Sequence, residues 1–262
     1  IVGLGASDMF GHGVGNADLY TLHLERLLNE RHPERGWRVI NMAVPSYNAV
    51  MEVETLVQKG LQFEPDLVLM HVASNHLDLP TYIRVYEDPL RLDQSFFLGF
   101  LREMRSSRLE TEKRFGELAA VTKSELGWSR ASDPSKIPAR FRGLVGWEPY
   151  HAAMDQLVEL SRRHAFEVLV FSHLDVGITP RLLKQAAARG LPTACFIDDV
   201  VEHLDSRYGE GGFTAERFEK SDLAASPANS HPSPLLHEML AGWILREMEA
   251  RGIAERLLAA QS

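Results

Sequence analysis

The sequence predicts an α/β protein, a three-layer sandwich in which helices cover both faces of a five-stranded parallel sheet. Five short apolar runs of the kind that form buried parallel strands recur along the chain, and segments with apolar residues at helical spacing separate them. The runs are Ile1–Gly5, Arg38–Met42, Leu67–Val72, Glu167–Ser172 and Thr193–Ile197. Right-handed crossovers between such strands restrict the topology to a few doubly wound orders.

The helices are predicted from periodicity and from their start and stop signals. Leucines recur at helical spacing within Asp18–Arg31, and valines and a leucine do so over Val50–Val57. Later helices are expected at Tyr150–His164, Pro180–Arg189 and Pro234–Arg251. In the last of these, proline occupies the first turn and Gly252 follows the end, as helix signals require.

The chain is expected to form a single domain over residues 1–262, with an insertion at about 80–146. The insertion departs from the alternation because it carries a long charged helical stretch, Phe96–Leu126, followed by the loop-like Ser129–Pro138. Above the carboxyl edge of the sheet it would be a lid or a partner surface. The alternative is a solvated helical elaboration with no direct role.

Composition is that of an ordinary globular protein, with 45% hydrophobic and 24% charged residues. The formal net charge of −8 argues against a nucleic-acid partner, and no apolar stretch is long enough to span a membrane. Residue 1 lies inside the first strand and is not methionine, so we expect native sequence upstream, with room for a signal peptide or a membrane anchor. The compartment and the oligomeric state stay open. The one cysteine, Cys195, lies in an apolar run and is predicted to be a buried small hydrophobe.

A serine follows the first strand at the place where open α/β sheets carry their chemistry. Ser7 lies just past Gly5, beyond the carboxyl end of the first predicted strand. In open α/β sheets, ligands bind beyond the carboxyl ends of the parallel strands. The glycines at 11, 13 and 15 come after the serine and do not match a dinucleotide fingerprint. Taken alone, Ser7 is either a placed nucleophile or a small polar residue in a strand-to-helix connection, and the rest of the chain favours the nucleophile.

Three further segments are expected at the same edge of the sheet. Asn41–Asn48 is a polar turn whose backbone N–H groups would face a developing negative charge, and Ala73–His76 brings the amide of Asn75. Asn229–Pro232 is a loop that carries His231 ahead of the last helix. In acyl transfer a histidine takes the serine proton while hydrogen-bond donors stabilise the oxyanion.

These segments resemble, in order, the four sequence blocks of the SGNH (GDSL-like) hydrolase superfamily. Gly5–Gly11 resembles the first block, whose serine is the nucleophile, and Val39–Ser46 resembles the second, whose glycine N–H lines the oxyanion hole. Ala73–His76 resembles the Gly-x-Asn-Asp block, whose asparagine is the third donor, and Ala228–Pro232 resembles the Asp-x-x-His-Pro block that supplies acid and base. One block alone is a weak signal, whereas four in register are a strong one.

The resemblance implies a flavodoxin-like SGNH fold and a serine esterase without a cofactor or a metal. Ser7 would attack the ester carbonyl while His231 takes its proton. The N–H groups of Ser7 and Ser46 and the side chain of Asn75 would hold the oxyanion. Substrates of the superfamily include acylated sugars, lipids and small esters, so we expect a small-molecule or glycan ester, with a carbohydrate O-acyl ester as the first candidate.

The chain departs from the family pattern at five positions: Ala6, Ser46, Ala73, His76 and Ala228. The most serious is Ala228, which stands where the family has the acid three residues before the histidine. Replacing that acid by asparagine in a serine protease lowers kcat by about 10⁴-fold. Turnover is therefore expected to be slow.

Asn229, two residues before His231, is the first candidate to orient the imidazole through its side-chain oxygen, as asparagine does in Cys-His-Asn enzymes. A backbone carbonyl and Asp222 are the alternatives. Two other functions stay open. One is an O-acyltransferase that uses the same residues with a sugar hydroxyl in place of water, and the other is a catalytically silent module that binds acylated glycans or a protein partner.

Other polar residues are given less weight. His12, His71 and His76 are expected near the same rim, but strand-end histidines usually hydrogen-bond locally and no carboxylate spacing supports a metal site. Asp198 and Asp199 are interpreted as a solvated turn after the fifth strand. His237, early in the last helix, is expected to pack or to cap.

Overall fold

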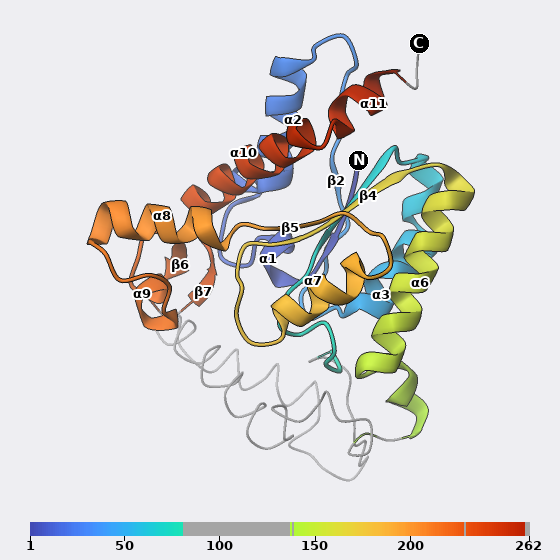
Figure 1. Cartoon of the computed structure of the whole chain (residues 1–262), viewed down its shortest axis with the longest axis horizontal. Coiled ribbons are helices and arrows are strands. Elements are labelled where there is room, and N and C mark those ends of the chain that lie inside the picture. Colours follow the sequence, from blue (N-terminus) through green and yellow to red (C-terminus); the bar gives the residue numbers. More distant parts are fainter. Residues whose placement is uncertain (81–136, 138, 228, 260–262) are drawn as a thin grey trace, which may run out of the picture.

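The computed structural model describes residues 1–80, 137, 139–227 and 229–259, and Figure 1 shows the arrangement of their helices and strands. The central sheet has five strands in the order β2-β1-β3-β4-β5, and every neighbouring pair is parallel. The strands are β1 (Val2–Gly5), β2 (Ile40–Asn41), β3 (Leu67–His71), β4 (Glu167–Ser172) and β5 (Thr193–Cys195). The predicted five-stranded parallel sheet is confirmed.

Helices cover both faces of the sheet, which confirms the three-layer prediction. One face packs against α2 (Tyr20–Arg31), α8 (Ile197–Tyr208), α10 (Pro234–Ala250) and α11 (Ile253–Ala259). The other packs against α3 (Ala49–Gln58), α6 (Trp147–His164) and α7 (Thr179–Ala187). Successive residues of β3 alternate between the two cores, with Leu69 in the first and Val68 and Met70 in the second. A strand buried on both faces needs apolar residues throughout, which is why these runs are continuous.

Several boundaries differ from the sequence-based expectation. The second strand has only two residues because β2 lies at an edge and pairs with β1 alone. Asp198 and Asp199 do not lie in a connecting turn, because α8 begins at Ile197 and both residues lie in its first helical turn. Acidic side chains interact favourably with the helix dipole at this end. The smaller helical segments are α1 (Ser7–Phe10), α9 (Ala215–Glu219) and the 3-10 turns Asn16–Asp18, Gly60–Phe63 and Ala139–Leu144.

The segment before α10 is also more regular than expected. Asn229–Pro232 was predicted as a loop, but it forms β7, which pairs antiparallel with β6 (Ala224–Ser226) in a separate two-stranded sheet. The polar, proline-containing sequence gives no apolar alternation, so sequence periodicity does not predict this strand.

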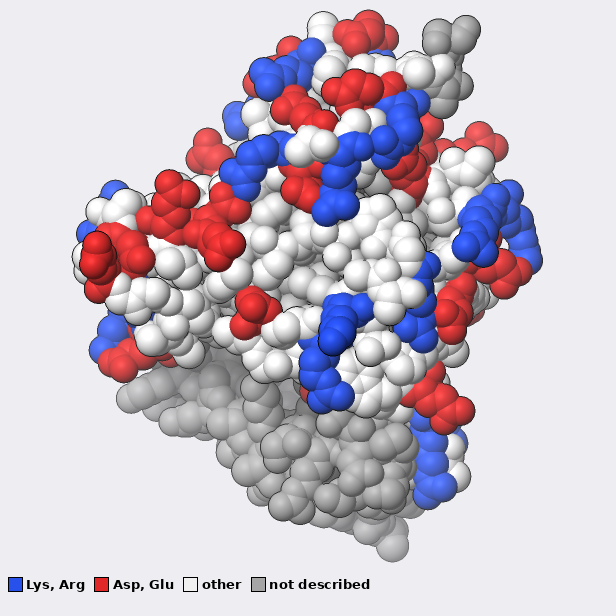
Figure 2. Space-filling view, viewed as in Figure 1, with Lys and Arg blue, Asp and Glu red and all other residues white. Residues whose placement is uncertain are grey.

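The prediction that Cys195 is buried is wrong, because this residue is exposed. Cys195 ends β5, the strand at the other edge of the sheet, where only β4 pairs with it. Figure 2 shows mainly uncharged residues at the centre of the face where β5 lies in Figure 1, with acidic and basic side chains mixed around it. The last residue of an apolar run can therefore be exposed when the run forms an edge strand.

Most of the predicted insertion, including Phe96–Leu126 and all of 129–138 except Ile137, lies outside the described residues. The described flanks pack together, since Leu79, Ile137 and Val145 form a small apolar cluster. Gly146 also donates its N–H to the carbonyl of Leu77 at 2.9 Å. None of the described helices is both long and apolar enough to cross a membrane.

The loop between β2 and α3 contains a strained residue. Ser46 has a φ of +66°, in the left-handed region that costs a residue with a Cβ about 1–2 kcal/mol relative to glycine. This is the position where the SGNH pattern has glycine. The backbone of the turn therefore keeps the conformation that glycine favours although the side chain has changed.

A second feature of the fold is the buried His237 of α10, which caps α2. Its Nδ1 accepts the backbone N–H of Tyr20 at 3.1 Å, and its ring stacks on that of Tyr20 with centroids 5.4 Å apart. The N-cap residue of α2, Leu19, supplies no side-chain acceptor of its own. The expected packing or capping role is confirmed. Burial, together with the nearby His23, lowers the pKa of His237 to about 4.

We predict that Ser46→Gly is more stable than Ser46→Ala by about 1 kcal/mol, because both variants lose the hydroxyl but only glycine relieves the left-handed backbone. The measurement is the free energy of unfolding in urea for the two variants and the wild type. Equal stabilities, or a more stable alanine variant, would contradict a strained turn at Ser46.

We predict that stability falls as the pH drops from 6.5 to about 4, partly through His237. Its folded-state pKa lies below the usual 6.5, so protons bind the unfolded chain preferentially in this window, at a cost of roughly 2–3 kcal/mol. In His237→Asn, whose amide oxygen replaces the Nδ1 acceptor without titrating, the loss should be smaller by that amount. Parallel stability curves for wild type and variant, from denaturant titrations at each pH, would refute the assignment.

Candidate active site

Ser7 is the first residue of α1, the short helix that follows β1 at the carboxyl edge of the sheet. A Cβ added at Gly3 would lie 2.9 Å from Sδ of Met9, and one at Gly5 would lie 2.8 Å from Cβ of Met9. Glycine at both positions thus allows α1 to fold back closely onto β1. The half-buried Ser7 side chain makes no hydrogen bond with any residue in the described ranges.

His231 lies on β7, which is a neighbour of α1. Its Nδ1 lies 2.5 Å from Oδ1 of Asn229, and its backbone N–H donates to the same oxygen at 3.2 Å. The amide of Asn229 is oriented by its other end, since Nδ2 donates to the carbonyl of His12 at 3.3 Å. His231 therefore donates from Nδ1, and its Nε2 carries the lone pair that a general base needs.

Gly13 contributes to this arrangement because it lets the loop approach Asn229 closely. A Cβ at Gly13 would lie 2.4 Å from Nδ2 of Asn229, and the φ of +101° also favours glycine. The exposed ring of His12 packs near that of His231, with centroids 4.7 Å apart. The side-chain amide of Asn229 is thus held between the backbone of His12 and the ring of His231.

The alternative acid, Asp222, is not available to His231. Its carboxylate accepts from Nε2 of His203 at 2.9 Å and pairs with Nε of Arg207 at 2.8 Å. Among the described residues, the carboxylate of Asp222 is therefore engaged by His203 and Arg207, and Nδ1 of His231 is engaged by Asn229, the first of the candidates. Ala228 lies outside the described residues, and alanine carries no carboxylate in any conformation.

Ser46 and Asn75 follow β2 and β3, the two strands that flank β1. Together with Ser7, which follows β1, they therefore lie at the carboxyl ends of the strands. Nδ2 of Asn75 donates to the carbonyl of Tyr47 at 3.0 Å, which ties the loop after β3 to the loop after β2. The second N–H of this amide has no acceptor among the residues that the structure describes. The backbone N–H of Val44 donates to the carbonyl of Gly5 at 3.1 Å and joins the loop after β2 to β1.

His76, the residue after Asn75, is buried; it stands where the SGNH sequence block has aspartate. Its Nε2 lies 3.0 Å from Oε2 of Glu52 on α3, and its Nδ1 lies within hydrogen-bond distance of the backbone of Ala73. Burial lowers the pKa of His76, but the charge and hydrogen bond of Glu52 and the bond with Ala73 outweigh it and raise the pKa above its usual value. The pair anchors the turn that carries Asn75 to α3.

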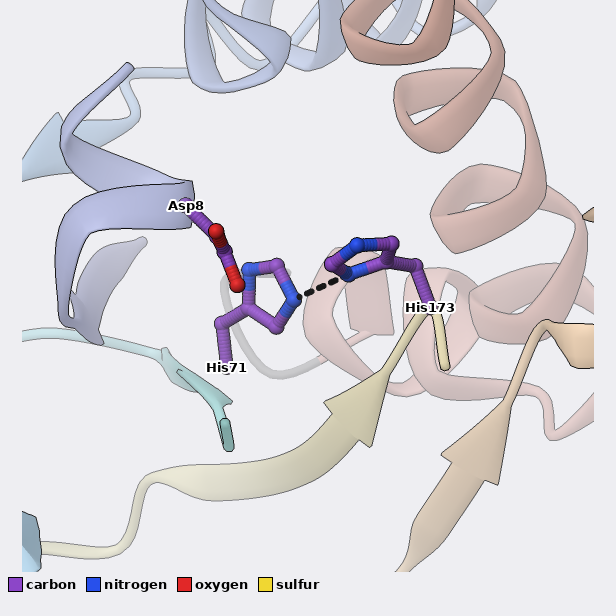
Figure 3. Close-up of side chains that lie close together, drawn as sticks. All are labelled: Asp8, His71 and His173. Carbon is purple, nitrogen blue, oxygen red and sulfur yellow. Dashed lines mark hydrogen bonds between the residues drawn. The ribbon is translucent and has the colours of Figure 1, made fainter. Parts of the chain in front are cut away.

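A second group of polar side chains consists of Asp8, the residue after Ser7, together with His71 and His173 (Figure 3). Burial lowers the pKa of His71 and of His173, and it raises the pKa of Asp8 against the opposing charges of nearby histidines. The sequence analysis placed His71 near this rim but gave no role to Asp8 and did not single out His173. The signal was present, because His173 follows β4 directly, at the carboxyl edge of the sheet.

We compared the chain with known proteins. No family model matches it, and no curated protein matches it in sequence. Solved structures do match. An acetyl xylan esterase, AlAXEase, superposes with a TM-score of 0.55 and 10% identity over 94% of this chain and 98% of its own. A putative lipolytic protein of the G-D-S-L family from Desulfitobacterium hafniense matches with a TM-score of 0.51 and 11% identity, over 94% and 97% of the two chains.

The psychrotrophic esterase EstA from Pseudoalteromonas sp. matches with a TM-score of 0.50 and 11% identity, over 95% of this chain and 96% of its own. At these identities the matches establish the architecture and not the chemistry. The chain has the SGNH hydrolase-like fold.

Proposed function

We propose that the protein is an ester hydrolase that uses Ser7 as nucleophile and His231 as general base. The observation that carries the proposal is the 2.5 Å contact between Nδ1 of His231 and Oδ1 of Asn229. This contact gives the imidazole the acceptor that Ala228 lacks. It favours an enzyme over a silent module, because the missing acid was the main argument against catalysis.

The mechanism follows from the tautomer of His231. With Nδ1–H bound to Asn229, Nε2 takes the proton of Ser7 as its Oγ attacks the ester carbonyl. The backbone N–H groups of Ser7 and Ser46 and the second N–H of Asn75 are the donors proposed for the oxyanion. His231 then protonates the leaving alcohol, and water attacks the acyl-enzyme with the same imidazole as base.

The neutral amide of Asn229 holds the imidazole but stabilises its charged form less than a carboxylate would. We therefore expect slow turnover rather than none. As substrates we propose carboxylic esters, with carbohydrate O-acyl esters first. The fold is shared with an acetyl xylan esterase, which supports beginning with acetylated sugars.

We predict that Ser7→Ala lowers the hydrolysis of p-nitrophenyl acetate by about 10³-fold or more, because the nucleophile is lost. Intact-mass measurements should detect an acyl adduct in the wild type and none in the variant. Ser230→Ala, which removes an exposed serine next to His231, is the matched control and should stay active. An adduct that forms but is not hydrolysed would indicate an acyltransferase instead. Neither adduct nor activity on any ester would leave the silent module.

We predict that Asn229→Ala lowers kcat by about 10- to 100-fold, because the imidazole loses the acceptor that fixes its tautomer. Asn229→Asp should keep activity and shift the ascending limb of the kcat/KM profile to higher pH, since a carboxylate favours the protonated imidazole. A role in folding alone would change stability without moving this limb. Unchanged kinetics in both variants would remove Asn229 from the mechanism.

A further inference from the structure

A ring nitrogen of His71, a ring nitrogen of His173 and a carboxylate oxygen of Asp8 all lie within 4.8 Å of one another. Strand register brings them together. Gly5 pairs with His71 across β1 and β3, and His71 pairs with Phe171 across β3 and β4. The residues that leave β1 and β4 at their carboxyl ends therefore flank His71. In Figure 3, Asp8 and His173 approach His71 from opposite sides.

The two imidazoles are held in place before any ligand binds. They are 1% and 3% exposed, and Nε2 of His71 lies 3.0 Å from Nδ1 of His173. The ring of His71 stacks on Phe171, with centroids 4.6 Å apart and an interplanar angle of 18°. Its Nδ1 lies 3.2 Å from the hydroxyl of Tyr20, so this hydroxyl can accept the Nδ1 proton and leave the Nε2 lone pair facing His173.

Asp8 differs from the two histidines because its carboxylate takes no part in the hydrogen bonding within the group. Its carboxylate receives no hydrogen bond from the described part of the chain, although His71 and His173 are bonded to each other. A half-buried carboxylate that receives no hydrogen bond from the described residues can take a partner from outside the chain, such as an ion. Asp8 is also the half-buried member of the group, whereas His71 and His173 are buried.

We propose that Asp8, His71 and His173 bind a divalent first-row transition-metal cation, with Zn²⁺ as the representative ion. Two imidazole nitrogens and one carboxylate oxygen are a ligand set for such ions, whereas Ca²⁺ and Mg²⁺ prefer oxygen ligands. At the tetrahedral angle that Zn²⁺ prefers, two nitrogens at 2.0–2.1 Å from one ion lie about 3.3–3.4 Å apart, so the two ring nitrogens, 3.0 Å apart, need to separate by only a few tenths of an ångström. Binding requires the bridging proton to leave and the carboxylate to swing inward.

The test is Zn²⁺ binding by the full chain after dialysis against a chelator, measured by calorimetry and, with Co²⁺, by visible absorption. We expect one ion per chain with a dissociation constant of about 1 µM or below. Asp8→Asn and His173→Gln each replace a proposed ligand. We expect them to weaken Zn²⁺ binding by more than roughly 10- to 100-fold, which is the loss when only a hydrogen-bonded neighbour of a ligand is replaced. Asp8→Asn removes an unpaired carboxylate, so the metal-free variant should fold at least as well as the wild type.

The matched controls are Asp175→Asn, an exposed carboxylate two residues after His173, and His164→Gln, an exposed histidine at the end of α6. Both should bind Zn²⁺ as the wild type does. Ser7→Ala should also bind it, which separates this proposal from the proposed ester hydrolysis. The absence of stoichiometric binding, or binding that Asp8→Asn and His173→Gln leave unchanged, would overturn the site.

Discussion

The close packing of α1 on β1 is the constraint on which the carboxyl edge of this protein depends. Gly3 and Gly5 leave room for the buried Met9, and a methyl group at either position would meet its side chain at under 3.0 Å. A side chain there would push α1 away from the sheet. Both Ser7 and Asp8 are on α1, so the proposed nucleophile and the carboxylate of the histidine cluster would move together. Two glycines in a strand, which weaken it in general, are here the condition for the site.

The second dependence is on the amide of Asn229. Each end of this side chain is used: the oxygen accepts from His231, and the nitrogen donates to the carbonyl of His12. A carboxylate could perform the first function but not the second. The close contact between Asn229 and the His12–Gly13 backbone therefore requires an amide at this position and not a carboxylate. The two hydrogen bonds also fix which end of the amide is oxygen and which is nitrogen.

Sequence alone predicts those parts of the structure that depend on local pattern. The five strands of the central sheet, five of the helices that cover it, and the positions of Ser7 and Asn75 at its carboxyl edge follow from apolar runs and from the rule that parallel strands present their carboxyl ends together. What it missed depends on position in the sheet or on distant contacts. Cys195 is exposed because β5 is an edge strand, and strand order is not written in an apolar run. The partner of His76 is Glu52, on a helix 24 residues earlier, and His173 meets His71 only through the register of β3 and β4.

The two groups of residues at this edge share one short helix but face different neighbours. Consecutive residues of an α-helix project about 100° apart, so Ser7 and Asp8 cannot point in the same direction. Asp8 points toward His71, next to β3 and β4, whereas β7, with His231 and Asn229, is itself a neighbour of α1. An ion held by Asp8 would therefore be bound one residue from the proposed nucleophile without using any residue proposed for the ester reaction. Since α1 has only four residues, an ion that fixes Asp8 would also restrict the motion of Ser7. This coupling would act through the backbone of one helical turn.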